Sequence, residues 1–91
     1  MSEVNTTLET AVLGEQVDIF MRSRVGEYIQ KRADDYANAA YAALKKCDPY
    51  DSRAVQTLQN QIHVAESVIG WMEEAIEDGL NALGILDDIG E

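Results

Sequence analysis

The residues of this 91-residue chain that could do chemistry are one histidine, one cysteine and several acid pairs in the last third. His63 and Glu66 would lie one turn apart on a helix, a spacing that can hold a metal ion. Metal-binding bundles use the order Glu-x-x-His and supply it more than once, whereas here the order is reversed and occurs once. We therefore expect no metal site, and we interpret His63 as a surface or interface residue.

The cysteine and the acid pairs do not form a recognisable catalytic set. Cys47 and His63 would be about four helical turns apart, too far to act as nucleophile and base. Cys47 also has no partner for an internal disulfide, which agrees with a reducing compartment. The acid pairs at 73–74 and 77–78 lie at helical i,i+4 spacing, but no other residue converges on them. We expect a protein that is not an enzyme and binds no cofactor.

The elements that would position these residues are separated by one strong turn signal, KKCDPYD, which contains the only proline. Asp48 can cap a helix whose first residue is Pro49, where the missing N–H costs nothing. Lys45 and Lys46 suit the end of a preceding helix, because cations complement its free carbonyl groups. The pattern predicts that one helix ends near Cys47 and another begins near Pro49.

Apolar residues after the turn recur every three or four positions, which predicts a long helix over residues 49–82 with a heptad-like stripe. We expect Gly84 to end this helix and residues 84–91 to form a flexible tail. A chain of this size buries only a modest core, so we expect the stripe to pack between copies of the chain. The expected oligomer interface consists of Leu58, Ile62, Ala65, Ile69, Met72 and Ile76.

Two more helices are predicted before the turn, over residues 6–21 and 23–47, with Ser23 as the cap of the second. The stretch ADDYANAAYAAL places small side chains where a neighbouring helix can approach closely, so we expect the tightest packing there. Trp71 and most tyrosines are expected in the core or an interface. The predicted fold is one all-α domain, a long antiparallel helical hairpin with a shorter N-terminal helix, bundled in a homo-oligomer.

Charge is divided unevenly along the chain, whose net charge is -10. All seven Lys and Arg lie within residues 22–53, whereas residues 54–91 contain eight acids and no base. In an antiparallel hairpin we expect Arg22 and Arg24 to lie near the acids at 73–78. Such exposed pairs stabilise a protein by less than about 1 kcal/mol each.

We also expect Lys31 and Arg32 to face Glu66. The acids left over have two interpretations, a solvated helix face or a surface for a basic protein partner. The residues of this acidic surface are Glu73, Glu74, Glu77, Asp78, Asp87 and Asp88.

The same negative charge bears on partners and location. It opposes direct binding to nucleic acid and to anionic membranes by repulsion. No apolar run has the length of a membrane span or of a signal-peptide core, so we expect a cytoplasmic protein.

Two long stretches, LGEQVDIFMRSRVGEYI and DPYDSRAVQTLQNQIHVAESVIGWMEEAIEDGLNAL, resemble small uncharacterised helical proteins encoded by tailed bacteriophages and prophages. The shared features are Leu13-Gly14, Val25-Gly26, the Asp48-Pro49 turn, Leu58-Gln59-Asn60, and Trp71 followed by Ala75, Ile76 and Gly79. The resemblance supplies no catalytic residues. It implies a phage-encoded accessory or assembly protein, present in the host cytoplasm or in the virion.

These observations lead to two hypotheses of function. The first is a non-enzymatic helical interaction or assembly protein that self-associates through its apolar stripe. The alternative is an acidic decoy, which would present carboxylates in place of phosphates and inhibit a host nucleic-acid-binding protein.

Overall fold

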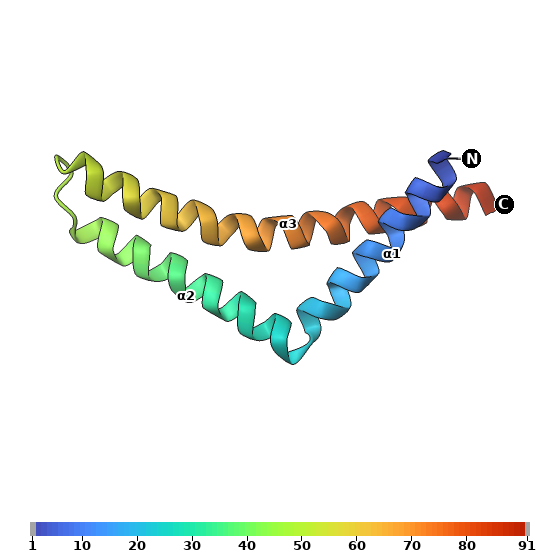
Figure 1. The fold of residues 1–91 in the computed structure, drawn as a ribbon, viewed down its shortest axis with the longest axis horizontal. Coiled ribbons are helices and arrows are strands. Elements are labelled where there is room, and N and C mark those ends of the chain that lie inside the picture. The colour runs from blue at the N-terminus through green and yellow to red at the C-terminus, as the bar shows by residue number, and fades with distance from the viewer. Residues whose placement is uncertain (1, 91) are drawn as a thin grey trace.

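The computed structural model describes residues 2–90, and over this range the chain forms three helices and no strand. The helices are α1 (Ser2–Arg22), α2 (Arg24–Lys46) and α3 (Ser52–Gly90). α2 lies along the first half of α3, and α1 returns across the second half, so the three helices outline a triangle (Figure 1). The all-α class predicted from the sequence is confirmed.

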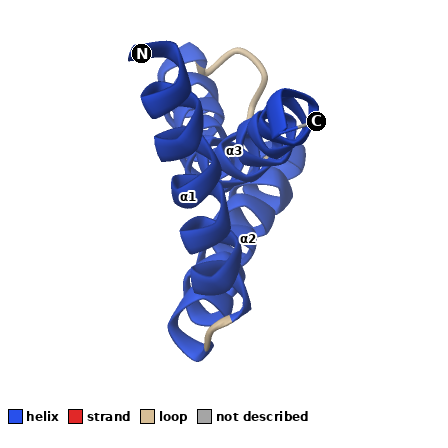
Figure 2. Cartoon of the chain, turned by 90° about the vertical axis from the view of Figure 1, so that its right-hand side faces the viewer, coloured by secondary structure: helices blue, strands red, loops and turns tan. Residues whose placement is uncertain are grey.

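The molecule is long and thin for its mass. Its principal extents are 60 × 28 × 16 Å and its radius of gyration is 18.3 Å, whereas a compact domain of this length has a radius of gyration of about 12 Å. Figure 2 shows the chain along its length, with α1 and the C-terminal end of α3 toward the viewer and the α2–α3 turn behind them. Since α1 and α2 diverge from their shared corner, no region of the described chain is enclosed by all three helices.

The corner between α1 and α2 is built by a serine cap, as the sequence predicted. The backbone of Ser23 is extended, and its Oγ accepts a hydrogen bond of 3.0 Å from the Gly26 N–H. The Gln30 side chain donates to the Met21 carbonyl at 2.8 Å. Gly26 is buried against the end of α1, where a side chain would overlap the Phe20 carbonyl group. These contacts stop α1 and redirect the chain.

The turn between α2 and α3 lies where the sequence predicted it, but α3 begins a few residues later than expected. α3 begins at Ser52 and not at Pro49, and its cap is Asp51, whose Oδ1 accepts from the Ala54 N–H at 3.1 Å. The Asp48 Oδ1 instead accepts from the Tyr50 N–H at 2.9 Å. Both aspartates are good caps, and Asp48 is used for a turn around the proline, which leaves Asp51 to start the helix.

The C-terminal end of α3 corrects a second expectation. Gly84 does not end the helix, and the predicted flexible tail is helical through Gly90; Glu91 lies outside the described residues. No glycine has a positive φ, so Gly84 does not adopt the left-handed conformation that ends a helix. α1 packs on Ala82, which is buried, and this tertiary contact carries α3 past a residue of low helix propensity.

The core is small and made mainly of alanine. Its buried apolar residues are Ala11, Ala37, Ala40, Ile62, Ala65 and Ala82. α1 and α3 cross at Gly14 and Gly79, both buried, where a Cβ on Gly14 would stand 2.7 Å from the Ala75 carbonyl oxygen and from the Gly79 Cα. Two glycines at one crossing let the helix backbones touch. Ala37 and Ala40 are buried, so the predicted alanine-rich face does pack inward, but the tightest packing lies at the glycine crossing and not on that face as predicted.

Candidate interaction surface

The predicted oligomer stripe is divided between buried and half-buried positions in the single chain. Ile62 and Ala65 are buried where α2 packs on α3. Four members are half-buried: Leu58, Ile69, Met72 and Ile76. Part of the stripe is therefore occupied by the chain's own α2, a use that periodicity alone does not distinguish from contact with another copy.

A second apolar row on α3 is exposed, and we call it the bare stripe: Val64, Val68 and Trp71. Val64 is 58% exposed and Trp71 is 68% exposed, with Val68 half-buried between them. Their i, i+4, i+7 spacing puts them on one face, and the next positions of that face are Ala75, Gly79 and Ala82. α1 covers Gly79 and Ala82, so the same face is covered in the second half of α3 and bare in the first.

Trp71 is the main departure from expectation among the aromatic residues. Trp71 is not packed in the core of the single chain. The three tyrosines expected in the core or an interface are also exposed: Tyr28 by 64%, Tyr36 by 50% and Tyr41 by 44%. In the single chain these side chains form exposed apolar surface, which only another molecule could cover.

The predicted ion pairs of Arg22 and Arg24 with acids of α3 are not formed. Among the described residues the ion pairs are Arg22–Asp18 at 3.0 Å and Lys31–Asp35 at 2.9 Å, each within one helix. Arg22 ends α1 at the corner of the triangle, and α2 diverges from α3 toward that corner, which leaves the second half of α3 beyond its reach (Figure 1). Arg22 and Lys31 each pair instead with an aspartate one turn away on the same helix.

Glu66 also has a partner other than the predicted one. Its Oε2 accepts a hydrogen bond of 3.0 Å from the Tyr41 hydroxyl, in place of an ion pair with Lys31 or Arg32. The hydrogen bond to this carboxylate raises the pKa of Tyr41 above its ordinary value. Tyr36 contributes a second link between the two helices, because its carbonyl accepts from the Gln61 side chain at 3.2 Å.

All six residues of the predicted acidic surface are exposed and lie on the second half of α3. α1 brings further acids to the same place, so we call α1 with residues 70–90 the acidic half: it contains ten described acids and one base, a net charge of -9. Residues 24–69, the balanced half, contain six acids and six bases, a net charge of zero. Folding thus gathers nearly all the excess charge at one end.

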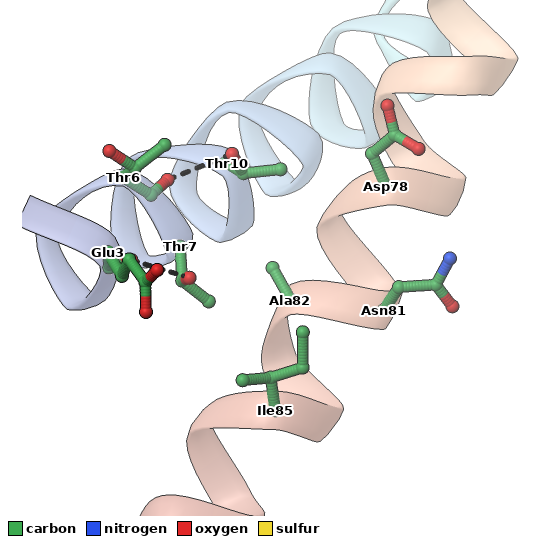
Figure 3. A pocket seen from close by; sticks show the side chains of 8 residues that line it. All are labelled: Glu3, Thr6, Thr7, Thr10, Asp78, Asn81, Ala82 and Ile85. Atoms are coloured by element: carbon green, nitrogen blue, oxygen red, sulfur yellow. Dashed lines mark hydrogen bonds between the residues drawn. The ribbon is translucent and has the colours of Figure 1, made fainter.

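A groove of about 520 Å³ lies between the start of α1 and the end of α3, beside Ala82 and Ile85 (Figure 3). The hydroxyl groups of Thr7 and Thr10 donate to carbonyl oxygens of their own helix, at 2.7 and 2.9 Å. The groove is open to solvent, and the carboxylates that line it come from Glu3 and Asp78. This arrangement offers no nucleophile and base in contact.

The residues first considered for chemistry are not brought together. His63 is exposed on α3, and Cys47 is a half-buried free thiol at the far end of α2. Within residues 2–90, no three His, Cys, Asp or Glu side chains are grouped as a metal site would require. The helices over that range also include none with the length and apolar content needed to cross a membrane.

Comparisons with models of known protein families, with curated proteins and with solved structures find no match to this chain. The interpretation therefore depends on the chain's own surface. Two features of the structure were not predicted from the sequence: the glycine crossing and the bare stripe. The i, i+4, i+7 spacing of Val64, Val68 and Trp71 was a readable signal, but it competed with the stronger stripe that begins at Leu58.

Proposed function

We propose that the protein is a non-enzymatic helical assembly protein that works by self-association. The observation that supports this most is the surface area of the single chain, 7090 Å². A compact monomer of 10.1 kDa would expose about 5,300 Å². The excess is about 1,800 Å² for one chain, which exceeds the roughly 800 Å² that each partner buries in a standard protein–protein interface.

The apolar content of this surface supports the same proposal. Exposed apolar residues occur on all three helices, and an exposed tryptophan is typical of the centre of an interface. α2 with the first half of α3 would act as the hairpin unit of each copy, and the copies would form a helical bundle. Following the resemblance to phage-encoded helical proteins, we extend the proposal to phage particle assembly or host contact, in the host cytoplasm or the virion.

Solution mass tests this proposal directly. Size-exclusion chromatography with light scattering should give at least twice 10.1 kDa for the native chain at both low and high protein concentration. The double variant Val64→Gln with Trp71→Gln should weaken association at least tenfold and keep its helicity, because both side chains are exposed in the single chain. Tyr50→Gln is the matched control, since Tyr50 is 93% exposed in the turn. A native chain that stays monomeric at all concentrations would refute the proposal.

A second function, the acidic decoy, is favoured by one specific observation. The six exposed acids lie on one continuous helix that extends to Gly90, and none of them belongs to an ion pair among the described residues. The segment from Glu73 to Asp88 spans about 22 Å at 1.5 Å per residue. A phosphate mimic needs such a rigid row, which a flexible tail would not give.

The decoy hypothesis predicts that charge, and not shape, captures the partner. Changing the six acids to Gln or Asn should abolish capture of DNA-binding proteins from a host lysate, and duplex DNA should compete with the native chain for the same proteins. Changing Glu27 and Asp34 on α2 is the control, and it should leave capture intact. Equal capture by the two variants would exclude this function.

A further inference from the structure

We infer that the groove between the start of α1 and the end of α3 binds a basic amphipathic helix of a partner protein. The helix would place apolar side chains between the two walls of the groove and Lys or Arg beside its two carboxylates. This surface is separate from the bare stripe, and the inference does not depend on self-association.

The first support is the position of the groove between two diverging helices. α1 and α3 touch at their crossing, where a Cβ on Gly79 would stand 2.8 Å from the Gly14 Cα. Beyond the crossing the helices separate, and the groove of about 520 Å³ opens between residues 3–10 and 78–85 (Figure 3). α1 forms one wall of the groove, so an occupant would lie beside α1 without displacing it. Two inclined helices leave a channel that the side chains of a third helix can fill.

The second support is the apolar character of the walls. Thr7 and Thr10 use their hydroxyl groups within α1, and their methyl groups point toward α3 (Figure 3). Ala82 and Ile85 face them from α3, and the Ile85 side chain is still 52% exposed in the single chain. Such walls favour leucine or isoleucine anchors at i,i+4 spacing on a docked helix.

The third support is the charge of the groove. Glu3 and Asp78 stand at opposite ends of it (Figure 3), and neither belongs to an ion pair among the described residues. Residues 1–21 and 54–91 contain no Lys or Arg, so neither wall supplies a cation of its own. The walls therefore attract bases that flank the apolar anchors of a partner, whereas they repel nucleic acid and anionic lipid.

The open shape of the groove favours a helix over a small molecule. Sites for small molecules enclose most of the ligand surface. The residues that line this groove come only from α1 and α3, and the remaining side is open to solvent. An amphipathic helix suits this shape, because only its apolar face needs to be covered.

A designed peptide tests the inference. The probe is a fluorescein-labelled peptide of about 18 Leu and Lys residues, with Leu at i, i+3, i+4 and i+7 so that one helical face is apolar. Fluorescence anisotropy should show saturable binding to the native protein. A scrambled peptide of the same composition should bind about tenfold more weakly, because it keeps the charge and loses the apolar face. Equal binding of the two peptides, or no saturable binding, would overturn the inference.

A pair of apolar variants locates the peptide on the protein. Ile85→Gln should weaken binding about tenfold, as loss of a central apolar contact does in other interfaces. Leu80→Gln is the matched control, since Leu80 is 63% exposed on the other side of the crossing, and it should leave the affinity unchanged. Circular dichroism verifies that both variants keep their helices. Equal losses of affinity would place the peptide elsewhere and contradict the inference.

A pair of charge variants separates the groove from the general negative charge. Glu3→Gln with Asp78→Asn should weaken peptide binding and reduce its dependence on salt. Asp87→Asn with Asp88→Asn removes the same charge from α3 outside the groove and should have a clearly smaller effect. Equal effects would show that net charge alone attracts the peptide, and the inference would fail. A monomer by light scattering that still binds the peptide in the groove would refute the proposed self-association and support this inference.

Discussion

At the scale of residues, glycine has opposite effects at different positions of the same fold. At Gly14 the neighbouring helix is so close that a Cβ would meet backbone atoms at 2.7 Å, and backbone atoms cannot turn aside as a side chain can. At Gly70, inside α3, nothing lies within 4 Å of the place where a Cβ would stand. Packing therefore requires the first glycine and leaves the second as a weak point of the helix.

This contrast gives a matched pair of variants. Gly14→Ala should lower the free energy of unfolding by about 1–3 kcal/mol, because it overpacks the α1–α3 crossing. Gly70→Ala should raise it by about 0.5–1 kcal/mol through helix propensity alone. Urea unfolding followed by circular dichroism measures both. Similar stabilisation by the two substitutions would contradict the crossing described here.

At the scale of elements, each helix begins or ends through local hydrogen bonds that one side chain decides. The two aspartates of the α2–α3 turn have separate tasks: Asp48 closes the turn and Asp51 caps α3. α3 is 39 residues long and packs on α2 only in its first half, so the cap lies at the end where α3 and α2 are held together.

The cap predicts a difference between two substitutions at one position. Asp51→Ala should lower the free energy of unfolding by about 1 kcal/mol, because the Ala54 N–H loses its acceptor. Asp51→Asn keeps an oxygen in the same place and should cost much less. Thermal unfolding of the two variants beside the native chain distinguishes them. An equal loss for both would indicate that the charge, and not the hydrogen bond, stabilises the helix start.

At the scale of the whole molecule, the arrangement of the helices sets both the shape and the distribution of charge. The helices form an open triangle with an alanine core, which leaves large apolar side chains on the outside. Folding also separates a half with net charge -9 from a half with net charge zero. The open shape leaves surface area for association and the fold concentrates the charge at one end, and neither property belongs to any single helix.

The sequence by itself determined the helices, because capping residues and apolar periodicity act over a few neighbouring positions. Ser23 was identified as a cap from its local context, and the turn at Asp48-Pro49 was found to within a few residues. The same local rules failed at Gly84, where a distant contact with α1 keeps the chain helical.

Only the tertiary structure decided which apolar residues are left for a partner. The row that includes Ile62 is partly used by α2, and the row that ends at Trp71 is free, although both have helical spacing. It also decided that Arg22 pairs within α1 and not with α3. Periodicity fixes which residues share a face, but the direction of the neighbouring helix determines which face is covered, and that direction depends on a close backbone crossing far away in the sequence.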